Sequence, residues 1–433
     1  MCVFFLACDV SVLIYAGDIS LQATNGLQFN ILPVSIQVAT PSRAMQLGGV
    51  DSGTKLSLDN VELSRVYTTN TLTFGGVFTS YLAVDGVSLS NNASMVALWS
   101  LSSGSSSYVR FSGGVSNFTQ PLDVRSVSDI FVSTNVTGVS SGILPASTFL
   151  YTNTFVSSSV NLVLSLIADT DCDNVGDVVL DVTTRLRSSN YPLLIQSHDV
   201  NVSGLLDAGA SYVRIGSCPG LTRVVDVGGS GLGSGDLRIS EYELSLIRST
   251  NFTIQTSGTG SLINVYTVTA VDVSGISDSV ILDARVTGSS LSFLQTSEWR
   301  GLRGYGGSGI TINGNISTTL SQLMLDGNAD SSGSDTITFQ SGSLWLSAGG
   351  GLTSQLILQP SASGSIVGIA PLYLSGSNGV QLMAPTYISS GSGVVRLNSD
   401  SDGDGLGLLI FGPSGSMNVN LLSGRYVRIL FSM

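Results

Sequence analysis

The sequence contains few of the residues that build helices or carry charge. Its 433 residues include one lysine, Lys55, four glutamates and one histidine, and charged residues make up 11% of the chain. Lysine and glutamate are good helix formers, so their scarcity argues against a helical protein. Serine, threonine, glycine, valine and leucine dominate instead, and such a composition favours strands and turns. The composition therefore predicts an all-β protein.

The chain also lacks a surplus of basic residues. Its formal net charge is -12 at pH 7, whereas a protein that binds nucleic acid needs lysine and arginine to displace counterions from phosphates. We therefore expect no nucleic-acid partner. Divalent cations and neutral glycans are better matched to this charge.

Cysteine is scarce, with four residues at positions 2, 8, 172 and 218. No pair has the C-x-x-C spacing of a zinc site, and four widely spaced cysteines do not indicate a dense disulfide framework. The cysteines leave the redox compartment open.

Long hydrophobic runs are absent as well. A membrane-spanning helix needs about 18 consecutive apolar residues, and no window of the sequence reaches that length. The first 17 residues are apolar, but they carry no basic residue and Asp9 interrupts them. We therefore expect no membrane span. We also favour an uncleaved N-terminal segment over a cleaved signal peptide.

Short segments that alternate apolar and polar residues recur along the whole chain. Each places two or three aliphatic or aromatic residues at period two and then breaks at glycine, serine or asparagine, as a strand with one buried face does. Examples are "KLSLD", "NTLTFGG", "YVRFSGG", "DLRIS", "GITING", "DTITFQSG", "QLILQ" and "LYLSG". A β-sandwich would give the same pattern.

A longer internal repeat favours a solenoid over the sandwich. The stretch from Ser42 matches the stretch from Thr222, an offset of about 180 residues, which is the size of a unit of many coils. The second unit carries roughly thirty to fifty extra residues, which a solenoid accepts because each coil contacts mainly its neighbours. The matched positions are Arg43 with Arg223, Gly48-Gly49 with Gly228-Gly229, Leu56 with Leu237, Leu58 with Ile239, and Glu62-Leu63-Ser64 with Glu243-Leu244-Ser245.

We therefore predict one continuous parallel β-helix over residues 1–433. It would comprise a partial repeat (1–34), a repeat unit (35–211), a second unit (212–425) with the inserted residues, and the start of a further unit (426–433). In "TKLSL" we expect Leu56 and Leu58 to point inward and Ser57 outward. We further expect the chain to be part of a longer array or to associate end to end with other copies.

The segments "LSLDNVELSRV" and "LMLDGNADSSGSDTITFQSGSLWLSAGGGL" resemble repeats of very large secreted β-helix proteins. These are the filamentous-haemagglutinin type and similar arrays in giant bacterial and algal surface proteins. The resemblance extends from about Ile19 to Arg428. It implies a right-handed parallel β-helix, located outside the cell or on its surface, that acts as an adhesin, filament or spacer and is not catalytic. It also implies neighbouring repeats as partners, with cell-surface glycans as possible ligands.

Two acidic stretches have the spacing of calcium loops. "DTDCDN" places Asp169, Asp171 and Asp173 at alternate positions, and "DSDGDG" places Asp400, Asp402 and Asp404 in the same way. In an EF-hand the twelfth position holds a bidentate glutamate, but here it holds Leu180 or Phe411. We therefore interpret both stretches mainly as turns, with weak calcium binding as the alternative and no other cofactor expected.

A β-helical polysaccharide lyase or glycosidase is the alternative function. Such an enzyme would need paired carboxylates, for which Asp326, Asp330 and Asp335 are available. The single histidine, His198, adjoins Asp199, but neighbours along a strand face opposite sides. We therefore expect a surface histidine instead of a catalytic triad.

The segment "SEWRGLRGYGG" interrupts the strand pattern. We favour a loop folded over a coil. The alternative is a protruding loop with Trp299, Arg300, Arg303 and Tyr305, which would be able to bind a glycan or a protein partner. Trp345 alternates with Leu344 and Leu346, so either the indole or the two leucines must face away from the core.

Overall fold

The computed structural model describes residues 11–17, 19, 27–29, 32–49, 54–89, 93–102, 107–138, 164–229, 235–331, 335–340, 344–348, 355–359, 365–369, 372–384, 386–389, 395–399, 408–411, 417–419 and 427–430. The chain divides into two compact units, Met1–Cys218 (unit 1) and Pro219–Met433 (unit 2). One continuous β-helix over residues 1–433, with the repeat boundaries given above, stays a prediction.

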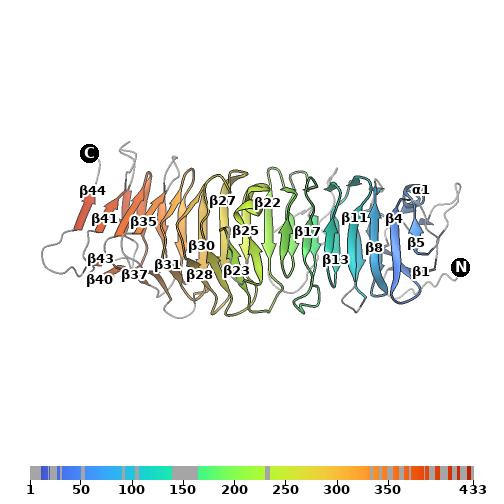
Figure 1. Cartoon of the computed structure of the whole chain (residues 1–433), viewed down its shortest axis with the longest axis horizontal. Helices are drawn as coiled ribbons and strands as arrows, with labels where there is room; N and C mark the ends of the chain where they lie inside the picture. Colours follow the sequence, from blue (N-terminus) through green and yellow to red (C-terminus); the bar gives the residue numbers. More distant parts are fainter. Residues whose placement is uncertain are drawn as a thin grey trace. The chain divides into compact units, whose positions relative to one another are not determined.

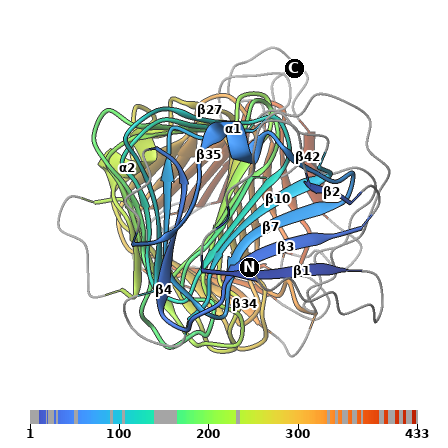
Figure 2. The ribbon, with the colours of Figure 1, turned by 90° about the vertical axis from the view of Figure 1, so that its right-hand side faces the viewer.

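Unit 1 is a parallel β-helix with three strands in each coil. From β7 onward, each strand pairs in parallel with the third strand after it, so that three stacks form three faces. In Figure 2, β1, β3, β7 and β10 lie side by side on one face and β4 lies on another.

The β1 face contains β1 (Val12–Ala16), β3 (Val34–Val38), β7 (Thr71–Gly76), β10 (Met95–Ser100), β13 (Leu122–Ser126), β16 (Leu164–Ile167), β19 (Leu193–Gln196) and β22 (Tyr212–Gly216). The β4 face contains β5 (Leu56–Leu58), β4 (Arg43–Gly48), β8 (Thr79–Asp85), β11 (Tyr108–Ser112), β14 (Ile130–Val132), β17 (Val178–Leu180) and β20 (Val200–Val202). The β9 face contains β9 (Ser88–Leu89), β12 (Ser116–Phe118), β15 (Val136–Gly138), β18 (Arg185–Arg187) and β21 (Leu205–Asp207), and a separate pair is formed by β2 (Leu27–Gln28) and β6 (Val66–Tyr67).

Unit 2 has the same plan of three parallel faces (Figure 1). The β25 face contains β25 (Ile247–Gln255), β27 (Ile276–Ala284), β30 (Leu302–Gly306), β33 (Leu323–Asp326), β36 (Leu356–Leu358), β39 (Gly379–Leu382) and β42 (Leu408–Phe411). The β23 face contains β24 (Leu237–Ile239), β23 (Val224–Val227), β26 (Leu262–Val265), β28 (Ser290–Phe293), β31 (Ile310–Ile312), β34 (Thr336–Phe339), β37 (Ser365–Ile369), β40 (Thr386–Ser389) and β43 (Met417–Val419). The β29 face contains β29 (Ser297–Trp299), β32 (Ile316–Thr318), β35 (Leu344–Ala348), β38 (Leu372–Gly376), β41 (Val395–Asn398) and β44 (Val427–Leu430).

The core of each unit consists of inward columns of aliphatic side chains. On the β4 face, one column runs in register through five strands and no member is more than 2% exposed. Burial of each such side chain contributes about 1.5–3 kcal/mol, so stability accumulates along the stack. This confirms the predicted parallel β-helix, while its right-handedness stays a prediction. The column is Leu82, Val109, Ile130, Val178 and Val200.

The predicted register of β5 is only partly correct. Leu56 and Leu58 are fully buried, as expected. Ser57 was predicted to face solvent, but only 6% of its surface is exposed, so that prediction was wrong. Ser57 is aligned with Gln46 of β4 and, through it, with Ala83 of β8, which are 7% and 5% exposed, so the outward row is covered on all three strands. A short helix, α1 (Asn60–Leu63), follows β5.

The two matched sequence stretches fold alike. In unit 1, β4 and β5 lead into α1, and in unit 2, β23 and β24 lead into α2 (Glu241–Ser245). Each helix begins with a capping box, made by Asp59 with Glu62 and by Ser240 with Glu243. The matched glycines Gly48 and Gly228 have φ of 72° and 77°, a left-handed conformation that glycine adopts without strain. The repeat therefore encodes one local structure twice.

Both helices are short, with four and five residues. Among the described residues, no helix has the length and apolar character needed to cross a membrane.

Candidate functional site

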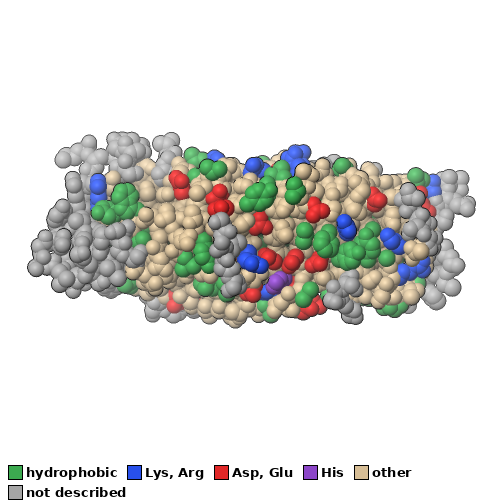
Figure 3. Space-filling view, in the orientation of Figure 1, with side chains coloured by type: hydrophobic (Ala, Val, Ile, Leu, Met, Phe, Trp, Pro, Cys, Tyr) green, Lys and Arg blue, Asp and Glu red, His purple; other side chains and the backbone are tan. Residues whose placement is uncertain are grey.

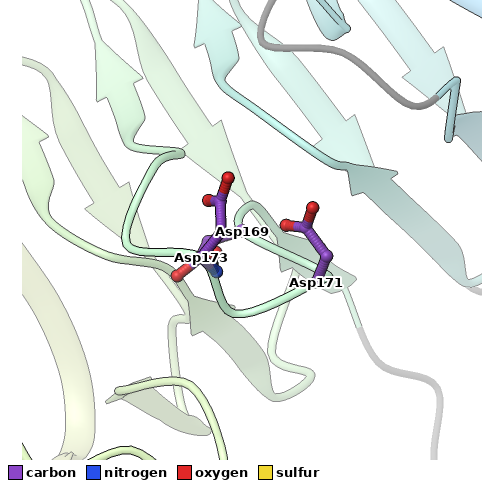
Figure 4. Close-up of side chains that lie close together, drawn as sticks. All are labelled: Asp169, Asp171 and Asp173. Atoms are coloured by element: carbon purple, nitrogen blue, oxygen red, sulfur yellow. Dashed lines mark hydrogen bonds between the residues drawn. The ribbon is translucent and has the colours of Figure 1, made fainter.

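The candidate site is the acidic loop that follows β16 in unit 1. Asp169, Asp171 and Asp173 project from this loop, and one carboxylate oxygen of each lies within 4.8 Å of the others (Figure 4). Asp169 is fully buried, whereas Asp171 and Asp173 are exposed. The structure thus brings together the three aspartates that the sequence predicted.

Hydrogen bonds within the loop give these carboxylates a structural role. The Asp169 Oδ1 accepts a hydrogen bond from the Asp173 backbone N–H at 2.9 Å, and Asp173 Oδ1 accepts one from the Val175 N–H at 2.9 Å. Asp169, Cys172 and Asn174 have φ between 56° and 74°, a conformation that short polar side chains tolerate in turns. The acidic run is therefore a tight turn that its own aspartates stabilise.

A disulfide between Cys172 and Cys218 closes the loop. Their Cα atoms are 5.7 Å apart, within the range of about 4.4–6.8 Å that disulfides require. Cys172 follows β16 and Cys218 follows β22, and these strands are joined through β19 in the stack. The disulfide thus links two corners of unit 1 that are two coils apart. The sequence did not predict this pair, because a separation of 46 residues has meaning only once the coil length is known.

The loop provides an incomplete cage for calcium. Calcium takes about six to eight oxygen ligands, and the cluster supplies three carboxylates. The position of the EF-hand glutamate is Leu180, which is buried in β17 with 1% exposure. The second predicted set, Asp400, Asp402 and Asp404, lies outside the described residues.

A second group of aspartates lies on the β4 face of unit 1. Asp129, Asp177 and Asp199 each directly precede a strand, and the register of those strands aligns them. Asp129 Oδ1 accepts a hydrogen bond from the Asp177 N–H at 3.0 Å, and Asp177 Oδ1 accepts one from the Asp199 N–H at 3.1 Å. These carboxylates therefore fix the start of one strand to the next.

His198 lies beside this group. Its Nδ1 is 3.3 Å from Asp177 Oδ1, and its side chain is 29% exposed. Figure 3 shows the histidine at the surface among acidic side chains. The contact is an ion pair or hydrogen bond with one carboxylate, in line with the predicted surface position.

The aspartates considered for an enzyme have different environments. Asp326 ends β33 with 5% exposure, and its Oδ1 accepts a hydrogen bond from the Asn328 N–H at 3.2 Å. Asp330 and Asp335 are half-buried in the segment that follows. The bond to Asn328 gives Asp326 the role of a turn residue, and a catalytic pair among the three stays a prediction.

The segment around Trp299 consists of strands β29 and β30, so the alternative of a protruding loop is wrong. Trp299 belongs to β29, has no exposed surface, and donates a hydrogen bond from Nε1 to Ser297 Oγ at 2.9 Å. Arg303 and Tyr305 belong to β30, and Arg300 binds the Ser274 carbonyl oxygen at 3.1 Å through Nη1. A buried indole cannot contact a ligand. A glycan or partner role for Arg300, Arg303 and Tyr305 stays a prediction.

Buried aspartates elsewhere are held by arginines. Asp123 is 5% exposed and lies 2.8 Å from Arg125 Nε, while Trp99 Nε1 donates to it at 3.3 Å. Burial raises the pKa of the Asp123 carboxyl above its ordinary value of 3.8, and the Arg125 charge opposes that shift. In unit 2, Asp283 binds Arg285 through two hydrogen bonds of 2.8 and 2.7 Å. These contacts stabilise the coils.

Two neighbouring coils of unit 2 carry a pair of aromatic side chains, Trp345 and Tyr373. The sequence analysis left open whether Trp345 faces outward. The indole of Trp345 faces outward while Leu344 and Leu346 are buried, which decides between the two orientations left open by the alternation.

Comparison of the chain with protein-family models, curated proteins and solved structures found no match.

Proposed function

We propose that the chain is a non-catalytic segment of an extracellular β-helix protein, serving as a surface filament, spacer or adhesin. The proposed class is that of the filamentous-haemagglutinin-like repeat proteins. The observation that carries the proposal is the disulfide-closed parallel β-helix of unit 1. Disulfides persist in oxidising compartments and are rare in the cytosol.

The use of polar side chains supports a structural role. The carboxylates of Asp169, Asp177 and Asp326 accept backbone hydrogen bonds in turns or at strand starts. The buried carboxylates of Asp123 and Asp283 are paired with arginines. A general acid or nucleophile needs a carboxylate that is free to reach substrate, whereas these groups hold the coils together.

A cleavage screen tests the non-catalytic part of the proposal. The full chain with its disulfide intact is incubated with neutral and acidic polysaccharides, and new reducing ends and unsaturated products are measured. We expect no turnover above a heat-denatured control. Turnover that disappears on Asp326→Asn, or on Asn substitution of Asp330 or Asp335, would replace the proposal by a lyase or glycosidase.

Fractionation of the producing cells tests the location. Antibody detection is expected in the medium or at the outer surface, and protease added to intact cells is expected to remove the signal. Detection only after lysis would contradict an extracellular protein.

A further inference from the structure

The β29 face of unit 2 exposes a large aromatic side chain that its core does not use. Trp345 is 57% exposed. By contrast, Trp299 has no exposed surface, and Trp99 is half-buried with its Nε1 bonded to Asp123. An exposed indole forgoes a large hydrophobic stabilisation. Trp345 therefore needs an explanation other than packing of the coil.

Trp345 has an aromatic neighbour on the next coil. Tyr373 of β38 is aligned with it in the parallel register, and the ring centroids are 5.2 Å apart with 47° between the ring planes. Neighbouring strands lie about 4.7–4.9 Å apart, so the pair extends along the stacking direction. We call Trp345 and Tyr373 the aromatic pair. It gives unit 2 a continuous aromatic surface across two coils.

Polar groups surround the aromatic pair. Arg396 of β41 is aligned with Tyr373 on the following coil and is exposed. Ser347 and Ser375, two residues beyond the rings in their strands, are joined by a 3.1 Å hydrogen bond between their hydroxyl oxygens. Figure 3 shows hydrophobic and basic side chains together over the β35–β41 part of unit 2. Apolar rings are thus flanked by hydroxyl and guanidinium groups.

We propose that the aromatic pair, with Arg396, Ser347 and Ser375, binds a neutral polysaccharide. This inference rests on the proposed adhesive function and names its ligand class. A sugar ring presents an apolar C–H face that stacks on an aromatic ring and a rim of hydroxyls that hydrogen-bond to arginine and serine. An extended glycan lying along the stack contacts both rings at once. The net charge of -12 disfavours polyanionic glycans.

Affinity gel electrophoresis of the full chain tests this surface. The gels contain hydroxyethylcellulose, mixed-linkage β-glucan, xyloglucan or galactomannan as neutral probes, and alginate or heparin as acidic ones. We expect at least one neutral probe to retard the protein. Trp345→Ala should weaken that binding at least about tenfold, and Tyr373→Ala should weaken it less.

Tyr242→Ala is the matched control. Tyr242 is 56% exposed on α2 of the same unit, so this variant also removes an exposed ring but lies outside the aromatic pair. It should bind like the wild type. Trp345→Gln is a second variant, and the unfolding midpoints of all variants are compared to show that they are folded. Binding should also shift the tryptophan fluorescence of the wild type and leave that of Trp345→Gln unchanged.

Several results would overturn the inference. These are no retardation by any neutral probe, equal loss in Trp345→Ala and Tyr242→Ala, retardation by the acidic probes alone, or Trp345-dependent self-association without glycan. Glycan binding that does not depend on Trp345 would remove this surface and leave the adhesive function standing. Cleavage of a probe would instead remove the non-catalytic function.

Discussion

Neighbouring side chains in one strand of this protein have opposite environments. In β31, Ile312 has no exposed surface and Thr311 is partly exposed. Ile312→Asp places a charge in the core and should lower the free energy of unfolding by roughly 3–5 kcal/mol. Thr311→Asp should change it by less than about 1 kcal/mol. Denaturant unfolding measures both, and equal losses would show that the strand register is wrong.

The buried carboxyl of Asp123 makes stability depend on pH. Its pKa is raised, mainly because burial disfavours the charged form. Between its ordinary pKa of 3.8 and the raised value, the folded state binds more protons than the unfolded state, so this group's contribution to stability falls as pH rises. Below 3.8 both states are protonated, and above the raised pKa the loss is complete.

Asp123→Asn removes this titration. The difference in unfolding free energy, wild type minus variant, should therefore decrease as pH rises from 3.8 through the raised pKa and then level off. Denaturant unfolding of both proteins across this pH range gives the difference directly. A difference that increases with pH would mean that Arg125 and Trp99 outweigh burial and lower the pKa.

Two short elements close the edges of their faces. β5 and β24 are edge strands, and each leads into a helix with a capping box. Ser240→Ala removes the acceptor for the Glu243 N–H and should lower the unfolding free energy of unit 2 by about 1 kcal/mol. Ser245→Ala, which removes a half-buried hydroxyl that donates a 2.6 Å hydrogen bond to the Tyr242 carbonyl oxygen in the last turn of α2, is the control and should have a smaller effect. If both variants match the wild type, the cap does not stabilise the edge.

The acidic loop is predicted to be a turn first and a metal ligand second. Calorimetric titration should find calcium binding no tighter than roughly millimolar, because three carboxylates leave the cage incomplete. Asp171→Ala should leave the unfolding free energy almost unchanged, since Asp171 is exposed. Micromolar calcium affinity that is lost in Asp171→Ala would contradict this assignment.

The internal repeat of about 180 residues predicted the parallel β-helix, and period-two alternation predicted its strands. It placed Leu56 and Leu58 inward because the aliphatic columns repeat from coil to coil. It failed at Ser57, which lies in a covered outward row with Gln46 and Ala83, and at Trp299, where glycines and arginines hid the alternation of β29 and β30. It left Trp345 undecided, since alternation gives opposite faces and does not tell which face is buried.

Contacts between residues on different coils could not be predicted from the sequence. Asp169, Asp171 and Asp173 are close in sequence and were found, whereas the partners Cys172 and Cys218 are 46 residues apart. These two cysteines can be paired only if the length of each intervening coil is known. That length depends on turns whose own lengths vary. The same holds for Trp345 with Tyr373, which only the register of β35 and β38 brings together.

At the scale of the whole molecule, the proposed extracellular β-helix needs both a stack of coils and an oxidising location. The Cys172–Cys218 disulfide depends on both, because β16, β19 and β22 must stack in the observed order and the thiols must be oxidised. Loss of a disulfide that closes a loop of this size costs about 2–4 kcal/mol. Reduction should therefore weaken unit 1.

The most direct test is disulfide mapping of protein taken from its own cells, with free thiols alkylated before lysis. Mass spectrometry of a digest made without reduction should find the peptides of Cys172 and Cys218 joined, and reduction should separate them. Peptides in which both residues are alkylated, or in which either is joined to a different cysteine, would contradict the stacking of these coils or the extracellular location.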